Sequence, residues 1–534
     1  MTRLLVSEVE AVEERRLSAQ QAIDARKTAV ERNRLGQFAT PNALAVEMAK
    51  CVAELRGADA DPIRFADPTI GSGSFFSAAL TVFGSDAIAS ASGVELDEEF
   101  VEAARDLWRD SGLQVVQGDF ALHLEEGSLP SAPNVMLANP PYVRHHHLSR
   151  DDKDRLVRLA AEKVGVRVNG LSGLYVYFLL LATSWLEEDG IAAWLIPSEF
   201  MDVNYGAPLR GFLASQVTLL RVHRFAAHDV QFDDALVSSV VVVFRKRHPR
   251  DGHRVECSLG PFLNDRSVVE DVLATELAGA RKWSIYPRHE LNDRHAAGSG
   301  TGASLGDFFR VQRGIATGHN KFFVLPRAEA ERLELPERFL RPILPSPRHL
   351  KSTVIEADCD GFPLVEPQLV VLDCDLPEER VEAEYPALWK YLSQATQLGV
   401  RDRYLIAKRL PWYRQERREA APFVCTYMGR GSDDKQPVRF IRNKSRAIGT
   451  NLYLLLQPRG ALAEMLRDYP ERAEEVHGLL AAVTGHELRG EGRVYGGGLN
   501  KIEPGELVRV SARSFVDRWP ELHVERAVQE RLFE

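Results

Sequence analysis

The chain has 534 residues, 45% of them hydrophobic and 27% charged, and a formal net charge of -9 at pH 7. This length exceeds what one hydrophobic core usually serves, so we expect two or more domains in a soluble globular protein. The charged start argues against a secretion signal, the longest apolar run (residues 173–185) is too short to span a bilayer, and five scattered cysteines show no zinc spacing. A cytoplasmic protein with no membrane partner and no metal site is the expectation.

Four segments are expected along the chain. Residues 1–35 form a charged helical extension without an assigned role. Residues 36–250 alternate strand-length apolar runs with helical patterns, which predicts a mostly parallel sheet covered by helices on both faces. Residues 251–303 form a connecting segment, and residues 304–534 form a second domain in which the alternation is lost. The expected strands lie within residues 62–68, 87–96, 113–119, 134–141, 191–197, 217–225 and 238–246.

Acidic residues follow three successive strands of the first domain. Asp67 follows the first strand, Gly71 and Gly73 form a turn before a helix, Glu95 ends the second strand, and Asp119 follows the third. Ligands bind beyond the carboxyl ends of such strands, and glycines let the backbone approach them closely. An acid at the position of Glu95 can accept both hydroxyls of a ribose; a solvated strand end is the alternative. Three acids repel pyrophosphate and favour a cationic ligand, so S-adenosylmethionine fits better than a dinucleotide.

Two apolar residues next to these acids are assigned to the same cofactor site. Asp119 can accept a hydrogen bond from an adenine amino group while Phe120 lies against the ring. Leu96 directly follows Glu95. The sequence therefore predicts that Asp119 and Phe120 contact the adenine of the cofactor and that Leu96 belongs to the same site.

The tetrapeptide NPPY, residues 139–142, ends an apolar strand. An adenine N6 amino group is a poor nucleophile because its lone pair is delocalised, and acceptors for both of its protons restore lone-pair density. Asn139 Oδ1 and the carbonyl of Pro140 can supply them, since prolines restrict the backbone directions. Tyr142 then offers a face for base stacking near a methyl cation. This chemistry needs positioning and electrostatics without a covalent intermediate; a simple turn is the alternative.

Taken in order, DPTIGSGSF, GVELDEEF, GDF and NPPY resemble the gamma-class DNA adenine-N6 methyltransferases, the group of the Taq I enzyme. The order is distinctive, with cofactor motifs first, the catalytic tetrapeptide second and a recognition region last. The resemblance implies an α/β fold: a class I S-adenosylmethionine-dependent methyltransferase domain with a mixed, mostly parallel sheet, followed by a mixed α+β target-recognition domain. Thr69 departs from the small or cysteine residue common in relatives.

The resemblance assigns further residues on either side of these motifs. GQFATPNALAVEMA, residues 36–49, is similar to an extra cofactor motif in which Thr40 and Pro41 match residues at the methionine end. Capping of a helix that begins near Asn42 is another role for Thr40. Residues 228–246 are similar to a hairpin motif in which Phe232 matches an aromatic that contacts the flipped base. Ordinary core packing is the alternative for Phe232.

A basic region lies in the second domain. Residues 401–459 contain 14 Lys or Arg and 5 Asp or Glu, which predicts a footprint for a polyanion, with a solvated face as the alternative. Residues 305–325, 439–456 and 495–507 resemble segments of target-recognition domains. The basic residues expected to contact phosphate are Arg439, Arg442, Lys444 and Arg446.

The expected function is transfer of a methyl group from S-adenosylmethionine to N6 of a flipped adenine in duplex DNA, within a restriction-modification or related defence system. A separate restriction endonuclease acting on the same site is an expected partner. Two alternatives stay open: a methyltransferase that uses NPPY on protein glutamine or RNA guanine, and a DNA-binding subunit with a vestigial catalytic half. The target sequence, the oligomeric state and the role of His145–His147 are not readable from the sequence.

Overall fold

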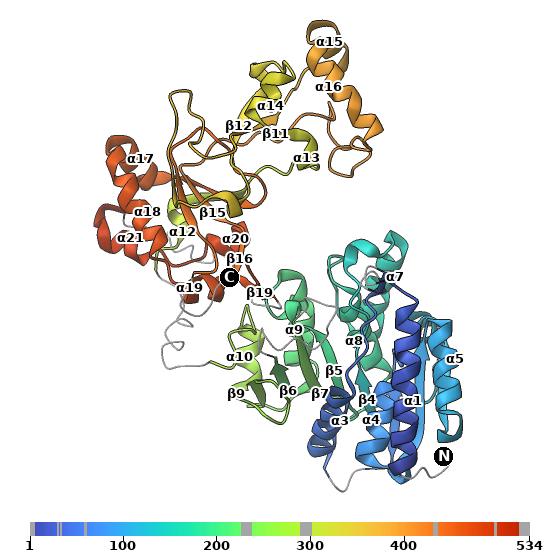
Figure 1. Ribbon diagram of the computed structural model, residues 1–534. Helices are drawn as coiled ribbons and strands as arrows, with labels where there is room; N and C mark the ends of the chain where they lie inside the picture. Colours follow the sequence, from blue (N-terminus) through green and yellow to red (C-terminus); the bar gives the residue numbers. More distant parts are fainter. Residues whose placement is uncertain are drawn as a thin grey trace. The chain divides into compact units, whose positions relative to one another are not determined.

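The computed structural model describes residues 6–28, 31–32, 35–57, 61–225, 238–288, 302–430, 436–495 and 499–522. The chain folds into two compact units, one of residues 1–298 with 495–497 and one of the remaining residues. In the first unit a large sheet lies between helices, and in the second unit several small sheets carry helices at their margins (Figure 1).

The first unit contains a nine-stranded sheet in the order β3-β2-β1-β4-β5-β7-β6-β8-β9. Strands β1 to β5 are parallel to one another, and β7 runs antiparallel between β5 and β6. Its strands are β1 (Ile63–Asp67), β2 (Ile88–Glu95), β3 (Leu113–Gln117), β4 (Val135–Ala138), β5 (Ile191–Pro197), β6 (Thr218–Arg224), β7 (Ser239–Arg245), β8 (Arg254–Leu259) and β9 (Val268–Leu273). Its helices are α1 (Val6–Ala25), α3 (Asn42–Arg56), α4 (Ser74–Phe83), α5 (Glu98–Leu107), α6 (Phe120–Glu126), α7 (Arg150–Val164), α8 (Leu174–Trp185), α9 (Ala207–Ser215) and α10 (Ala274–Gly279).

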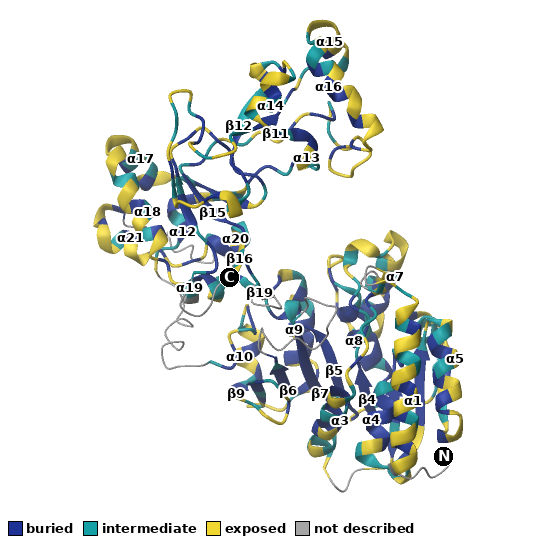
Figure 2. Ribbon diagram, in the orientation of Figure 1, coloured by how far each residue is buried: buried dark blue, intermediate teal, exposed yellow. Residues whose placement is uncertain are grey.

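Helices cover both faces of this sheet, so its central strands are apolar on both sides. In β4, Val135 and Leu137 pack into a core shared with α3 and α4, whereas Met136 and Ala138 pack into a second core with α7 and α8. Figure 2 shows the sheet buried and the outward helix faces exposed. The seven strands expected from the sequence are confirmed as β1 to β7, because continuous apolar runs of strand length identify strands buried on both faces.

The structure corrects the expectation for residues 251–303. Instead of only connecting two domains, this segment supplies β8 and β9, which extend the nine-stranded sheet. These strands lie at the edge, and β9 alternates half-buried and exposed residues, so charged side chains interrupt its apolar pattern. At the other end of the chain, the expected N-terminal helix is confirmed as α1, which packs on α4 and α5.

The second unit is built around a five-stranded sheet in the order β10-β18-β15-β17-β13, with two three-stranded sheets, β11-β14-β12 and β16-β20-β19. Its strands are β10 (Phe309–Arg313), β11 (Val324–Pro326), β12 (Leu340–Ile343), β13 (Val354–Ile355), β14 (Leu369–Leu372), β15 (Phe423–Thr426), β16 (Met428–Arg430), β17 (Phe440–Asn443), β18 (Tyr453–Pro458), β19 (Arg493–Tyr495) and β20 (Leu499–Lys501). Its helices are α12 (Leu305–Phe308), α13 (Asn320–Phe323), α14 (Arg327–Arg332), α15 (Glu378–Glu384), α16 (Pro386–Gln397), α17 (Gly460–Asp468), α18 (Ala473–Ala481), α19 (Gly485–Glu491), α20 (Pro504–Leu507) and α21 (Arg513–Arg518).

The second unit has its own cores on both faces of its larger sheet. Phe423 and Leu454 belong to one core, and Val424 and Leu455 belong to the other. A further core lies around β11, β14 and α16. In the part of the chain that the structure describes, no helix combines the length and apolarity needed to cross a membrane.

A buried histidine in β6 makes the stability of the first unit depend on pH. His223 is fully buried with Nδ1 2.9 Å from Ser258 Oγ, and burial lowers its pKa to about 4. Below pH 6.5 the unfolded chain takes up a proton that the folded chain refuses, so stability falls from pH 6.5 towards 4, by about 2 kcal/mol at pH 5. Urea unfolding at pH 7 and at pH 5 tests this. Between these two pH values, the free energy of unfolding should fall by about 2 kcal/mol less in His223→Asn than in the wild type.

The exposed His248 provides the control for this prediction, since His248→Asn should keep the wild-type pH dependence. Equal losses in the wild type and His223→Asn would show that other groups carry the effect.

Candidate cofactor and catalytic site

The candidate site lies where neighbouring parallel strands of the first unit end. Asp67 is the last residue of β1, Glu95 is the last residue of β2, and Asn139 directly follows β4. Because β2, β1 and β4 are adjacent and parallel, their carboxyl ends share one edge of the sheet. This edge is where open α/β sheets bind ligands.

The glycine turn between β1 and α4 needs both of its glycines. Gly71 and Gly73 have φ angles of +53° and +93°, a region that favours glycine. A Cβ atom on Gly73 would lie 2.3 Å from Trp108 Nε1, whereas no described atom lies within 4 Å of a Cβ atom on Gly71. Trp108 Nε1 donates to the carbonyl of Ser72 at 2.9 Å. The turn is therefore packed on Trp108 at one glycine and open at the other.

The two acids nearest this turn are desolvated and bound to backbone amides. Asp67 is 1% exposed, its Oδ1 accepts from Thr69 N at 2.8 Å, and burial raises its pKa to about 7. Glu95 accepts from Gly71 N at 2.9 Å and from Asp97 N at 2.8 Å, and burial raises its pKa as well. Buried carboxylates gain most from a cationic ligand, since a nearby positive charge favours their ionised form.

The third acid is placed differently from the first two. Asp119 caps α6 through Oδ1, which accepts from Ala121 N at 2.7 Å, and its Oδ2 lies 2.8 Å from Arg155 Nη2. This ion pair offsets the charge expected to face a ligand.

The apolar neighbours of the acids also differ from each other. Phe120 is 2% exposed and packs against Phe178 and Trp185 with ring centroids 5.6 and 5.9 Å apart, so it belongs to the core. Leu96 is 71% exposed beside Glu95. The sequence expectation that Phe120 faces an adenine ring therefore does not match its packing, while Leu96 offers an open apolar surface at the edge.

The side-chain amide of Asn139 is held by its nitrogen. Nδ2 donates to the carbonyl of Phe38 at 3.0 Å and to Thr40 Oγ1 at 3.1 Å. The carbonyl of Phe38 can only accept, so it fixes which end of the amide carries the nitrogen. Asn139 Oδ1 is buried and has no hydrogen-bond partner among the described residues. A buried acceptor without a partner is costly, so this atom is a marked candidate for contact with a ligand.

Thr40 and Pro41 lie directly before α3. Pro41 is the N-cap of that helix and no side chain caps it, so the alternative that Thr40 caps the helix is wrong. The Thr40 hydroxyl instead orients the Asn139 amide, and its carbonyl accepts from Ser74 Oγ at 3.2 Å. This segment thus touches both the tetrapeptide and the helix that follows the glycine turn.

Tyr142 is 8% exposed and is held by hydrogen bonds of its hydroxyl and of its backbone N–H. Its hydroxyl donates to the carbonyl of Leu195 at 3.2 Å, its backbone N–H donates to Gly36 O at 3.1 Å, and its ring lies 5.6 Å from that of Phe38. Burial raises the pKa of Tyr142, which keeps the phenol neutral. Pro140 is buried beside it. Phe232 lies outside the described residues.

Several residues that build this site had no chemical signal in the sequence. Thr69 Oγ1 lies 3.2 Å from both Asp67 Oδ1 and the carbonyl of Asn139, and so joins the cofactor turn to the tetrapeptide. Gly36 has a φ of +66°, and a Cβ atom there would lie 2.5 Å from Tyr142 N. Gly36 begins the segment that the resemblance assigns to the cofactor, but no local pattern indicated its contact with Tyr142, which lies far along the chain.

The two glycines of the turn predict different costs of substitution. Gly71→Ala should destabilise the protein by about 1–2 kcal/mol, the cost of placing a non-glycine residue in the left-handed backbone conformation. Gly73→Ala should cost at least about 3 kcal/mol, because Trp108 must also move. Denaturant unfolding followed by tryptophan fluorescence measures both, and equal losses would contradict the close packing of Gly73 on Trp108.

Comparison with known protein families adds independent information. A family described as "Eco57I restriction-modification methylase" matches residues 134–231, which include β4 and the tetrapeptide. A second family, "Type II methyltransferase M.Eco57I, C-terminal domain", matches residues 290–530. The two matches divide the chain near the boundary between the two compact units.

Relatives of similar length are also found. The Type II methyltransferase M.XamI of Xanthomonas campestris pv. amaranthicola is 28% identical over 89% of this chain and 85% of its own length. The Type II methyltransferase M.AccI of Acinetobacter calcoaceticus is 23% identical over the same shares of the two chains. Among solved structures, the Type IIL restriction-modification enzyme MmeI in complex with DNA has a TM-score of 0.52 at 12% identity, covering 81% of this chain and 64% of that one.

These findings agree with the geometry of the first unit. The sheet order and the ligand edge are those of a class I methyltransferase, whose methyl donor is S-adenosylmethionine. The residues present fit that cationic group, because Asp67 and Glu95 are desolvated carboxyls and the turn is open at Gly71. The chain is therefore similar to restriction-modification methyltransferases, with an Eco57I-type methylase match around the tetrapeptide and an M.Eco57I-type C-terminal match over residues 290–530.

Proposed function

We propose that this protein is a site-specific DNA methyltransferase that methylates N6 of an adenine flipped out of duplex DNA. It acts in the cytoplasm as the modification activity of a restriction-modification system, and a separate endonuclease cuts the same site. The observation that carries the proposal is the Oδ1 atom of Asn139, which is buried and has no hydrogen-bond partner among the described residues. Pro140, the next residue in the chain, supplies the second acceptor through its carbonyl. An exocyclic amino group has two protons to donate, and these are two acceptors on adjacent residues.

The anchoring of the Asn139 amide supports this role. If the amide could rotate, Nδ2 would sometimes face the substrate amine, and two donors would meet. The contacts of Nδ2 with Phe38 O and Thr40 Oγ1 oppose that rotation. Preorganised acceptors of this kind stabilise the positive charge that develops on the attacking amine. The bound S-adenosylmethionine supplies the electrophilic methyl group.

The remaining residues have positioning roles in this proposal. Tyr142 provides a ring held by Leu195 and Gly36, against which a flipped base can stack. From the resemblance, Phe232 contacts the other face of the base. Asp67 and Glu95 hold the cationic and ribose parts of the cofactor, and Leu96 covers its adenine. The cofactor set proposed is Thr40, Asp67, Gly71, Gly73, Glu95, Leu96 and Asp119, whereas Phe120 packs in the core.

The decisive experiment uses tritiated S-adenosylmethionine, unmethylated genomic DNA and two proteins, the wild type and Asn139→Ala. We expect label in N6-methyladenine with the wild type. With Asn139→Ala we expect a loss of at least about a thousandfold in the rate but cofactor affinity within about twofold, because removing a preorganised polar group costs several kcal/mol in the reacting complex alone.

Other outcomes of that experiment would reject the proposal. Label in RNA or protein but none in DNA would assign the tetrapeptide to another amine or amide. Wild-type turnover by Asn139→Ala would remove this residue from the reacting centre.

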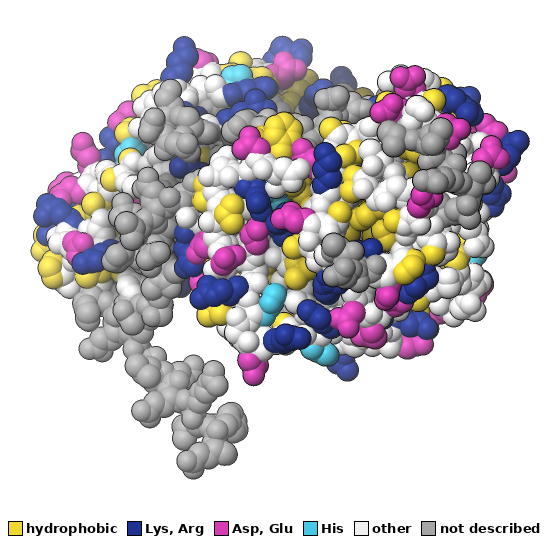
Figure 3. Space-filling view, turned by 90° about the horizontal axis from the view of Figure 1, so that it is seen from below, with side chains coloured by type: hydrophobic (Ala, Val, Ile, Leu, Met, Phe, Trp, Pro, Cys, Tyr) yellow, Lys and Arg dark blue, Asp and Glu magenta, His cyan; other side chains and the backbone are white. Residues whose placement is uncertain are grey.

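The basic residues first expected to contact DNA are partly used within the second unit. Arg439 donates from Nη1 to the carbonyl of Leu350 at 2.8 Å, and Lys444 Nζ lies 2.6 Å from Glu356 Oε1. Arg442 is half-buried and lies 3.9 Å from Glu474, whereas Arg446 is exposed. On the face shown in Figure 3, which is the underside of the view in Figure 1, Lys and Arg are interspersed with Asp and Glu. Three of the four side chains therefore have partners that would compete with phosphate.

A better candidate is the DNA-contact segment, which we define as residues 398–410. Its base is fixed, since Ile406 is fully buried and Arg409 donates to the carbonyls of Ala316 and Thr317 at 2.6 and 2.9 Å. Its tips project, with Tyr404 71% and Leu410 89% exposed. The exposed cations are Arg403, Lys408 and Arg401. Lys408 donates to the Tyr404 hydroxyl at 2.6 Å within the segment, and Arg401 pairs with Glu378 at 2.9 Å. Projecting apolar and aromatic side chains among cations suit contact with bases and phosphates together.

We therefore expect Arg403→Ala and Lys408→Ala each to weaken duplex binding and to lower its salt slope by about one. Tyr404→Ala should weaken binding about tenfold, the effect of losing one base-stacking contact. Fluorescence anisotropy at several salt concentrations measures the dissociation constant and its salt slope. The duplex contains the sequence that the enzyme methylates, in its unmethylated form.

Tyr469 is the matched control for Tyr404. It is 49% exposed in the same unit, and Arg472 lies 4.4 Å from its ring. Because Tyr469 lies outside the DNA-contact segment, Tyr469→Ala should leave duplex binding unchanged. Equal effects of the two tyrosines, or an unchanged salt slope, would move the DNA contact away from residues 398–410.

A further inference from the structure

The N-terminal helix α1 buries charged residues where a helix that only packs would bury apolar ones. Its buried residues are Val9, Glu13, Arg16 and Ile23, spaced along one face. Arg16 is 1% exposed and lies at the middle of this face. A buried ion pair is rarely more stabilising than well-packed apolar residues of similar volume. Stability alone therefore does not account for Arg16.

Arg16 contacts the glycine turn of the cofactor site directly. Its Nη2 and Nε bind Glu13 at 2.7 Å each, and its Nη1 donates to Ser72 Oγ at 3.0 Å. Ser72 Oγ in turn donates to Gln20 Oε1 at 2.8 Å. Ser72 is 2% exposed and lies between Gly71 and Gly73. Two side chains of α1 thus fix the Ser72 hydroxyl between the two glycines.

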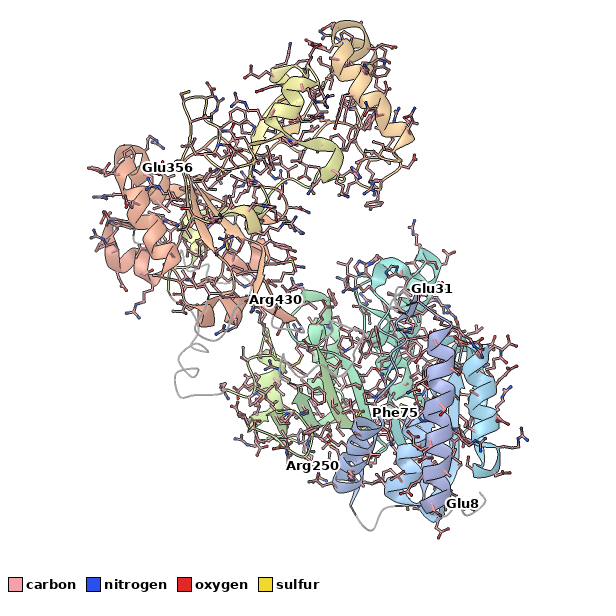
Figure 4. The ribbon with its side chains drawn as sticks, viewed as in Figure 1. Glu8, Glu31, Phe75, Arg250, Glu356 and Arg430 are labelled. Carbon is pink, nitrogen blue, oxygen red and sulfur yellow. The ribbon has the colours of Figure 1, made fainter. Side chains whose placement is uncertain are left out.

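The segment after α1 contacts the second loop of the same site. Lys27 Nζ forms an ion pair with Asp97 Oδ2, to which Gln37 Nε2 also donates at 3.2 Å. The backbone N–H of Asp97 donates to Glu95 Oε1. In Figure 4, Glu8 marks one end of this helical region and Glu31 lies beyond its other end, so α1 extends along the helical layer.

We propose that α1 and Lys27, which follows it, are part of the cofactor site. Arg16 and Gln20 are positioning residues that hold the glycine turn through Ser72, and Lys27 holds the Glu95 loop through Asp97. In this way a region without chemical motifs sets the affinity for S-adenosylmethionine. The inference rests on the cofactor assigned to the fold and is independent of the substrate proposed above.

The test measures cofactor binding and protein stability separately in the full-length chain. Gln20→Leu, Arg16→Lys and Ser72→Ala are each titrated with S-adenosylmethionine by calorimetry, and the melting temperature of each is measured without cofactor. We expect each variant to raise Kd about five- to tenfold, the effect of one lost hydrogen bond in a preorganised loop. In the Ser72→Ala background, Gln20→Leu should have no further effect on Kd, because both act through the same hydroxyl.

Arg15 on the same helix provides the control. Its side chain is mostly exposed and lies 3.7 Å from Asp106 of α5, away from the turn, so Arg15→Ala should leave Kd unchanged. Lower melting temperatures with a wild-type Kd in Gln20→Leu and Arg16→Lys would overturn the proposal and leave α1 a packing element. Additive effects of Gln20→Leu and Ser72→Ala would overturn the relay through Ser72. Failure of the wild type to bind S-adenosylmethionine would instead reject the cofactor assignment, and failure to label DNA would reject only the proposed substrate.

Discussion

The side-chain amide of Asn139 is held by two hydrogen bonds of its nitrogen, and the rest of the candidate site lies around this amide. Phe38 and Thr40 accept from Nδ2, which leaves the carbonyl oxygen as a buried acceptor. The sheet determines where this acceptor lies, because β4 is adjacent to β1 and parallel to it. The amide that can accept from a substrate amine and the acid that can bind a cationic cofactor therefore lie at the ends of neighbouring strands.

Burial gives the acidic edge its ligand preference. Asp67 and Glu95 are removed from water, and their hydrogen bonds from the described residues come from backbone amides and a threonine hydroxyl. A fixed cation of the protein would satisfy them permanently, and no described Lys or Arg pairs with either acid. Asp119 differs, since Arg155 already compensates its charge. The two acids nearest the glycine turn are thus the ones whose ionisation a cationic ligand favours most.

The sequence predicted what is local and failed where distant segments meet. The strands β1 to β7 were predictable because an apolar run or a turn residue is a local signal. The contact of Thr40 with Asn139 was not, because the two are 99 residues apart in the chain. Phe120 was expected at the ligand because of its neighbour Asp119, yet the packing of α6 on α8 turns its ring into the core. Residues 251–303 were expected to be a connector because the edge strand β9 carries charges in its pattern.

The hydroxyl of Thr69 has one proton and two acceptors, Asp67 Oδ1 and the carbonyl of Asn139, both at 3.2 Å. An ionised Asp67 attracts that proton strongly, whereas a protonated Asp67 accepts it weakly and leaves it to the carbonyl. With a pKa of about 7, Asp67 changes between these forms near neutral pH. The hydrogen bond from Thr69 to the carbonyl of Asn139 is therefore stronger when Asp67 is protonated and weaker when Asp67 is ionised.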